Sequence, residues 1–143
     1  MQVREAMTKD VQVVSPKQTI REAAKTMLEI DAGVLPVGEN DRLVGMITDR
    51  DIAVRGVAMG KGPDASVGDV MTADVKFCFD DQEVEEVTQN MGEIQVRRLP
   101  VVNREKRLVG ILSLGDVAQT GNQDTGETLS EISKPGGKHS QKA

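Results

Sequence analysis

The chain has 143 residues, a length that suits one compact domain or two very small ones and argues against a long multidomain enzyme. Aromatic residues make up only 1% of it, namely Phe77 and Phe79, so it cannot supply the stack of aromatic faces that binds single-stranded nucleic acid. The 18 basic residues are outnumbered by 23 acidic ones, which gives a formal net charge of −5. We therefore expect no nucleic acid as a main partner.

The chain holds one cysteine, Cys78, and one histidine, His139. A single cysteine cannot form an internal disulfide, and a histidine so far along the chain does not build a metal site with it, so we expect no metal. No apolar run approaches the roughly 18 residues of a membrane span, and residues 1–5 lack the apolar core of a signal peptide. We expect a cytoplasmic protein that does not bind membranes.

The sequence repeats itself in tandem. Three segments recur at an offset of 64 or 65 positions: 3–11 in 67–75, 35–37 in 99–101, and 42–48 in 107–113. This self-similarity predicts two structural repeats, 1–62 and 63–120. The remaining residues, 121–143, are rich in Gly, Ser, Thr, Lys and Gln, which is typical of a flexible tail.

Repeat one predicts a strand, a helix, two further strands and a second helix. In chain order these elements lie over 11–14, 20–28, 34–37, 43–47 and about 49–56. Thr19 and Glu22 form a capping box at the start of the first helix, where five apolar residues fall at helical spacing. A short polar segment joins the two later strands, which is typical of a hairpin.

Repeat two predicts the same order of elements, over 75–79, 84–91, 98–102, 108–113 and from about 115 onward. Because strand-helix-strand connections cross over with a right hand, the first two strands of each repeat are expected to be parallel and the third antiparallel. The predicted fold class is therefore α+β (mixed α/β), with two β-α-β-β-α repeats. A unit of ~60 residues buries too little surface to be stable alone, so we expect the repeats to pack sheet to sheet with pseudo-two-fold symmetry.

The residues that could carry chemistry occur where the last strand of each repeat meets its last helix. Thr48 is followed three residues later by Asp51, and Ser113 by Asp116. This spacing fits a helix cap, which contributes about 1 kcal/mol. It also fits a ligand site, because helix N-terminal amides bind phosphate and a nearby aspartate accepts hydrogen bonds from a ribose diol. The pattern leaves both interpretations open.

Repeat two adds Arg97 and Arg98 ahead of its Leu-Pro-Val strand, where repeat one has Gly33 and Val34. Two arginines on an acidic chain are candidates for a phosphate-binding fork. Since adjacent strand residues point to opposite faces, we expect only one of them to reach a ligand. The alternative is a solvated edge whose arginines pair with neighbouring acids.

The doubled pattern of Val-x-x-x-Met-Thr, a helix, Leu-Pro-Val, and Leu-Val-Gly followed by Thr/Ser-x-x-Asp resembles the CBS (cystathionine β-synthase) domain pair, or Bateman module, of the stand-alone bacterial type. The resemblance covers about residues 3 to 119. It implies a regulatory module that binds an adenine nucleotide, AMP, ADP, ATP or a related adenosyl ligand, in the cleft between the repeats and signals occupancy to an unidentified partner protein. The alternative is a CBS-type interaction module without ligand binding.

The resemblance also assigns roles to residues. Asp51 and Asp116 bind ribose, and Thr48, Ser113, Arg97 and Arg98 bind phosphate or ribose. We further expect short apolar strand residues to flank adenine, namely Val13, Val14, Phe77 and Phe79. No nucleophile, base and orienting group can be assembled, so we expect no catalytic residues, no enzymatic activity and no required cofactor.

CBS pairs commonly dimerise through their helices, which implies a homodimer. The expected interface residues are Ile52, Ala53, Val57, Val117 and Ala118.

Overall fold

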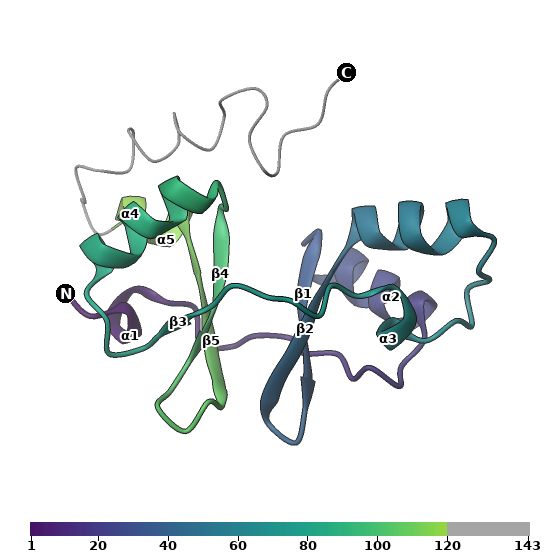
Figure 1. Cartoon of the computed structure of the whole chain (residues 1–143), viewed down its shortest axis with the longest axis horizontal. Coiled ribbons are helices and arrows are strands. Elements are labelled where there is room, and N and C mark those ends of the chain that lie inside the picture. The colour runs from purple at the N-terminus through teal and green to yellow at the C-terminus, as the bar shows by residue number, and fades with distance from the viewer. Residues whose placement is uncertain (120–143) are drawn as a thin grey trace. The chain divides into compact units, whose positions relative to one another are not determined.

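The computed structural model describes residues 1–119, which form two compact units of helices and short strands (Figure 1). Within the described residues, unit 1 combines Met1–Val11 with 76–119, and unit 2 consists of Gln12–Val75. Both units mix helices with strands, which confirms the predicted mixed α/β class. The predicted tail, 121–143, lies outside the described residues.

The main helix of unit 2, α2 (Ile20–Ile30), begins on the predicted capping box. Thr19 Oγ1 accepts a hydrogen bond from the Glu22 N–H at 3.1 Å, and the Glu22 carboxylate accepts one from the Thr19 N–H at 3.4 Å. Leu28, which the helical spacing grouped with the apolar stripe, is 82% exposed. It follows Ile20 by eight residues and therefore lies about 80° around the helix from it. The buried stripe consists of Ile20, Ala23 and Met27.

Unit 2 contains one antiparallel pair of strands, β1 (Val34–Glu39) and β2 (Arg42–Thr48). The predicted strand over 11–14 is wrong in extent, because only Val14 pairs, through a parallel bridge to Val37. The parallel direction agrees with the prediction. The boundary between the units falls within this segment, because Val11 belongs to unit 1 and Gln12 to unit 2.

The second helix of repeat one is irregular. It consists of a π-helical segment, η1 (Asp51–Gly56), and a 3-10 turn, η2 (Val57–Met59), and it ends at Gly60, which has a left-handed φ of 78°. The short helix α3 (Val67–Val70) follows. Although α3 opens repeat two in the sequence, it packs within unit 2.

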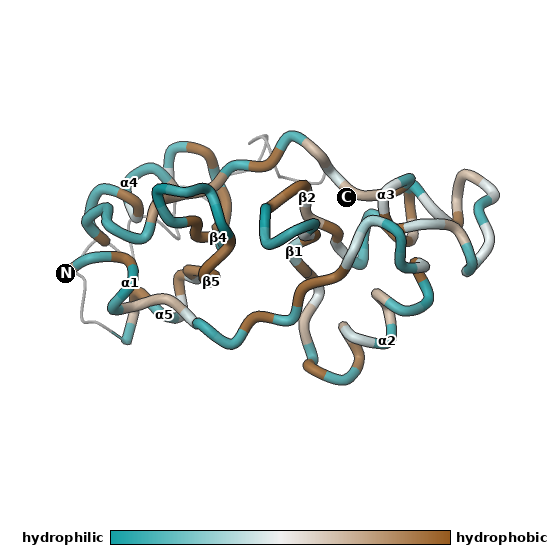
Figure 2. The backbone as a smooth tube through the Cα atoms, turned by 90° about the horizontal axis from the view of Figure 1, so that it is seen from below, coloured by the Kyte–Doolittle hydropathy of each residue, from teal (hydrophilic) through white to brown (hydrophobic). Residues whose placement is uncertain are grey.

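Unit 1 has the predicted strand directions. Its elements are α1 (Val3–Ala6), β3 (Cys78–Phe79), α4 (Val84–Ile94), β4 (Arg98–Val102), β5 (Leu108–Ser113) and α5 (Leu114–Gln119). The strand order is β3-β4-β5, with β3 parallel to β4 and β4 antiparallel to β5. β3 is shorter than the predicted strand over 75–79. β4 and β5 consist mostly of hydrophobic residues, which appear as brown stretches in Figure 2.

Each unit has its own hydrophobic core, completed by the first segment of the other repeat. Val3, at the start of repeat one, is fully buried in the core of unit 1. Val67, its counterpart at the start of repeat two, is fully buried in the core of unit 2. The two repeats have therefore exchanged their opening segments.

Candidate ligand-binding site

The strand-to-helix turns of both units carry the same pair of hydrogen bonds. In unit 2 the Thr48 N–H donates to Asp51 Oδ2 at 3.0 Å, and the Asp51 N–H donates to Thr48 Oγ1 at 2.9 Å. In unit 1 the Ser113 N–H donates to Asp116 Oδ2, and the Asp116 N–H donates to Ser113 Oγ, both at 3.1 Å. The predicted capping arrangement is therefore present twice, and the ligand role of the same residues stays a prediction.

A Met-Thr segment lies against the strand that leads into each turn. Thr8 and Ile111 of β5 exchange two backbone hydrogen bonds, at 2.9 and 3.0 Å. Thr72 and Met46 of β2 do the same at 2.8 and 2.9 Å. A Cβ atom on Gly110 would lie 2.7 Å from the Thr8 carbonyl oxygen. The Leu-Val-Gly and Met-Thr motifs are thus complementary, because only glycine lets the backbones approach this closely.

The same Met-Thr segments reach the aspartates of the turns. In unit 1 the Thr8 hydroxyl donates to the Asp116 carboxylate, 3.4 Å from Oδ2. In unit 2 an arginine intervenes, since Arg55 Nη1 lies 3.4 Å from Thr72 Oγ1 and 4.0 Å from Asp51 Oδ1. Sequence reasoning missed Thr8 and Arg55. The signal for Arg55 was its position four residues after Asp51, which places the two side chains on one helix face.

The arginine pair lies beside the turn of unit 1. Arg98 is directly opposite Ser113 in the β4–β5 register, and the Arg97 carbonyl accepts a hydrogen bond from the Leu114 N–H at 3.0 Å. Both arginines are exposed, and within residues 1–119 neither forms an ion pair. The pair thus lies on a solvated edge, without the ion pairs that the alternative expected in this part of the chain, and its role in binding phosphate stays a prediction.

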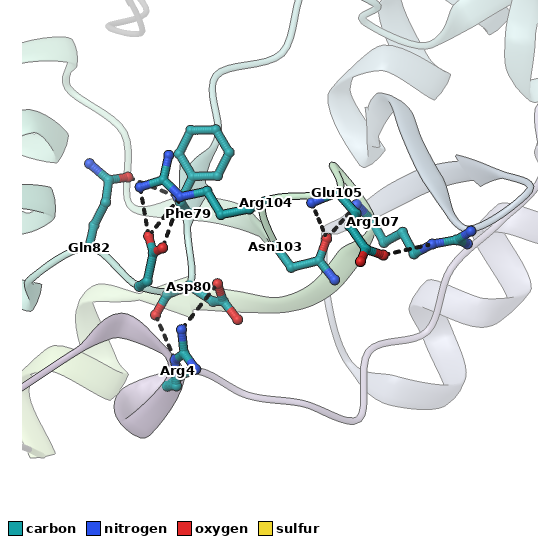
Figure 3. A network of polar contacts seen from close by, with 9 residues as sticks. Arg4, Phe79, Asp80, Gln82, Asn103, Arg104, Glu105 and Arg107 are labelled. Carbon is teal, nitrogen blue, oxygen red and sulfur yellow. Dashed lines mark hydrogen bonds and ion pairs between the residues drawn. The ribbon is translucent and has the colours of Figure 1, made fainter.

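The four residues assigned to adenine have different surroundings. Val14 is 2% exposed and belongs to the core of unit 2, whereas Val13 is 44% exposed. Phe77 is 42% exposed and packs edge to face on Phe79, with ring centroids 5.6 Å apart. The Arg104 guanidinium covers the Phe79 ring at 4.1 Å (Figure 3). Of these four residues, Val13 and Phe77 therefore have the apolar side chains most accessible to a ligand.

Polar contacts fix the β3–α4 turn of unit 1. Arg104 donates to both carboxylate oxygens of Asp81, at 2.8 to 3.1 Å, and these hydrogen bonds hold the pKa of Asp81 below its ordinary value. On the other side of the turn, the Arg4 guanidinium lies 3.7 Å from the Asp80 carboxylate, a contact visible in Figure 3. Burial, reinforced by the charge of Asp80, raises the pKa of the Cys78 thiol to about 12.

A surface cavity of about 320 Å³ lies along α4, and none of its lining residues belongs to either turn. It is lined by Cys78, Gln82, Glu86, Val87, Gln89, Asn90 and Glu93. In the part of the chain that the structure describes, no three His, Cys, Asp or Glu side chains gather to hold a metal ion. None of the helices described here is long and apolar enough to cross a membrane.

Two units of like construction, each with a helix that begins on a Thr/Ser-x-x-Asp turn, define a tandem α/β module. The chain belongs to the CBS domain family, whose model matches residues 3–56 and 67–120. CBS domain-containing protein YhcV of Bacillus subtilis (strain 168) is 42% identical over 133 residues, which cover 92% of this chain and 94% of that protein. The chain is therefore a CBS pair, a regulatory module of a kind that is generally non-catalytic.

Solved structures have the same fold. The crystal structure of Hypoxic Response Protein I with two coordinated zinc ions matches with a TM-score of 0.75 and 38% identity, over 84% of this chain and 98% of that one. The crystal structure of CBSX2 in complex with AMP matches with a TM-score of 0.74 and 28% identity, over 84% and 95% of the two chains.

Proposed function

We propose that this chain is a non-catalytic sensor that binds an adenine nucleotide, AMP, ADP, ATP or a related adenosyl ligand, and signals its occupancy to a partner protein. The observation that carries the proposal is the identical hydrogen-bonded turn in both units of a protein whose structural neighbour CBSX2 was solved with AMP. Each turn uses one oxygen of its aspartate, Asp51 or Asp116, in the cap. The second oxygen is contacted by Arg55 at 4.0 Å in Asp51 and by the Thr8 hydroxyl at 3.5 Å in Asp116, and it keeps a further lone pair for a hydrogen bond from a ribose diol.

We assign a separate group of residues to each part of the nucleotide. Ribose is assigned to Asp51 and Asp116, and phosphate or ribose to Thr48, Ser113, Arg97 and Arg98. Because Arg98 lies opposite Ser113 and is exposed, it is the member of the arginine pair that we assign to phosphate. Adenine is assigned to the exposed apolar residues Val13 and Phe77. The proposal includes a cytoplasmic location, which suits the free, buried Cys78.

A thermal-shift panel of AMP, ADP, ATP, NAD, S-adenosylmethionine and GTP tests the proposed function. A ligand that binds only the folded chain stabilises it by RT ln(1 + [L]/Kd), about 2.7 kcal/mol at a hundredfold excess over Kd. We expect at least one adenine ligand to raise the melting temperature and GTP to raise it less. The variant Asp51→Ala/Asp116→Ala is the control and is expected to lose the shift. If no adenine ligand shifts the melting temperature of the unchanged chain, the proposal is wrong.

A CBS-type interaction module without ligand binding is the second candidate. It is favoured by one observation: the capping hydrogen bonds already give all four turn side chains a structural role. This candidate predicts no shift with any nucleotide.

Self-association belongs to the same proposal. Of the expected interface residues, Val57 is 68% exposed, and Ala53 and Ala118 are also exposed. The expectation for Val117 is wrong, because α5 turns that side chain into the core of unit 1, where it is fully buried. Val54 and Met59, at 44% and 72%, extend the exposed apolar surface of η1 and η2. We propose that a second copy of the chain covers this surface, because contiguous exposed apolar patches usually mark an interface.

A further inference from the structure

The turn of unit 2 lacks the basic residues that flank the turn of unit 1. Gly33 and Val34 occupy the positions of Arg97 and Arg98. A Cβ atom on Gly33 would lie 2.9 Å from Asp49 Oδ2, so this position holds no larger side chain unless Asp49 moves. With two aspartates, Asp49 and Asp51, in the turn, a phosphate would meet repulsion there unless a cation comes from elsewhere.

Arg55 places a cation at this turn from η1. Its Nη1 lies 4.0 Å from Asp51 Oδ1, the carboxylate oxygen that the cap does not use, and 3.4 Å from Thr72 Oγ1. The Arg55 side chain is 51% exposed, whereas that of Asp51 is 14% exposed. A guanidinium has five N–H donors, and Thr72 takes one, so donors remain for an incoming anion.

Arg50 is the other arginine of this turn. Its backbone N–H donates to Asp49 Oδ1 at 2.8 Å, but among the described residues its exposed side chain forms no ion pair. Arg55 differs because its guanidinium is already oriented by two partners on two segments, Asp51 of η1 and Thr72 beyond α3. A guanidinium that is already oriented loses less conformational freedom on binding a phosphate than a freely rotating one such as that of Arg50.

We propose that Arg55 is the phosphate-binding and specificity-determining residue of unit 2, so that the two units recognise the phosphate of an adenine nucleotide from different elements. Unit 1 supplies the cation from β4, the strand paired with β5, and unit 2 supplies it from η1, the helical segment after the turn. This inference rests on the proposed nucleotide-binding function. It predicts that unit 2, although it lacks the arginine pair, still distinguishes AMP from adenosine.

The test measures unit 2 alone in the full chain. Ser113→Ala/Asp116→Ala removes the site of unit 1, and circular dichroism checks that the variant folds. AMP and adenosine are then titrated calorimetrically into this background with Arg55→Ala, Arg55→Lys or Arg21→Ala. Arg21 is the matched control, because it forms an exposed ion pair of unit 2, 3.7 Å from Asp64, away from the turn.

In Arg55→Ala we expect the AMP affinity to fall about ten- to a hundredfold, as for loss of a charge-assisted bond, and the adenosine affinity to stay within about threefold. Arg55→Lys keeps the charge but not the fork and is expected to recover part of the loss. Arg21→Ala is expected to change neither affinity.

Equal loss of AMP and adenosine in Arg55→Ala would overturn the inference, since Arg55 would then act only through Asp51. Unchanged AMP binding would also overturn it. If the background variant does not bind AMP but the unchanged chain does, unit 2 is not a nucleotide site, and the inference fails while the proposed function survives. If the unchanged chain does not bind AMP, the proposed function itself fails. Should the background variant not fold, Arg98→Ala serves in its place for the AMP titrations, because it leaves the cap of unit 1 intact and is expected to weaken AMP binding there.

Discussion

Asp116 has two tasks in the proposed site, and substitutions separate them. Its carboxylate caps α5 through Ser113 and has a second oxygen for ribose. We expect Asp116→Ala to weaken AMP binding about ten- to a hundredfold, because a hydrogen bond to a charged group contributes ~1.5–3 kcal/mol. The same change removes a cap worth about 1 kcal/mol, so urea unfolding is measured in parallel. Asp116→Asn, which keeps one acceptor oxygen, is the control.

If Asp51→Ala and Asp116→Ala both bind AMP with unchanged affinity, the two aspartates only cap their helices and do not bind the ligand. In that event the two turns are structural, and the interaction-module candidate gains support.

Arg98 serves only the phosphate in the proposed role division. Because it lies opposite Ser113 and forms no ion pair within residues 1–119, its removal leaves the described hydrogen bonds in place. We expect Arg98→Ala to weaken AMP binding far more than adenosine binding, as measured by calorimetry. Lys106→Gln, which removes an exposed cation from the β4–β5 loop, is the matched control. Equal losses for AMP and adenosine would refute the role division.

The buried thiol of Cys78 predicts both a reactivity and a pH dependence. Burial, with a smaller contribution from Asp80, raises its pKa from 9.0 to about 12, so the native thiol stays protonated at neutral pH. We expect slow reaction with a thiol reagent in the native state and rapid reaction in denaturant, because the thiolate is the nucleophile. Fast native labelling would show that β3 opens readily.

The sign of the pH effect follows from the raised pKa. The folded state keeps the Cys78 proton that the unfolded state loses above about pH 9, so this contribution to stability is present at lower pH and is lost as the pH rises toward 12. Urea midpoints of the unchanged chain should therefore fall more steeply above pH 9 than those of Cys78→Ala.

At the scale of elements, the contact between β5 and the Met-Thr segment sets the geometry of the turn. We expect Gly110→Ala to destabilise the chain by about 1–3 kcal/mol, because its Cβ would lie 2.7 Å from the Thr8 carbonyl oxygen and from Met7 Sδ. Gly115→Ala in α5 is the control, since its Cβ would meet only Ser113 Oγ at 3.5 Å. Alanine there is expected to stabilise the helix by ~0.5–1 kcal/mol. Equal unfolding midpoints for the two variants would contradict this account.

Local sequence patterns predicted most of the helices and strands, but they did not predict which distant segments pair with one another. The Thr19–Glu22 capping box and the two capped turns follow from residue spacing, which acts over a few positions. The strand directions of unit 1 follow from the order of the elements and the right-handed crossover rule. The strand predicted over 11–14 failed because a β-branched run does not show whether it pairs or crosses between units.

The exchange of opening segments could not be predicted for a related reason. Segments 3–8 and 67–72 share the Val-x-x-x-Met-Thr pattern, which does not show that each contacts the glycine strand of the other repeat. The Arg55–Thr72 contact depends on that choice, because Thr72 opens repeat two and yet lies in unit 2. The role of Arg55 therefore could not be predicted from residue spacing, because its contact with Thr72 forms only when the two repeats exchange their opening segments.

At the scale of the whole molecule, the exchange makes each unit depend on both halves of the sequence. Val3 completes one core and Val67 the other, and both are fully buried. Two covalent connections, at 11–12 and 75–76, link the units. Thr8, beside Asp116, and Thr72, beside Arg55, each lie a few residues ahead of one of these connections. A ligand that engages the turns would therefore act close to the points where the chain passes from one unit to the other.

Self-association is the last prediction, and it concerns the exposed apolar surface of η1 and η2. Val57 and Met59 are 68% and 72% exposed, so charges at these positions are tolerated in the folded chain but not in an apolar interface. We expect light scattering at micromolar concentration to give twice the mass of one chain. We expect Val57→Asp/Met59→Asp to give a single-chain mass with an unchanged circular dichroism spectrum and a lower melting temperature, because self-association stabilises the folded chain by mass action. Leu28→Asp, on the exposed face of α2, is the control and is expected to stay dimeric. A single-chain mass for the unchanged protein would refute the dimer, and a dimer that survives the double substitution would place the interface elsewhere.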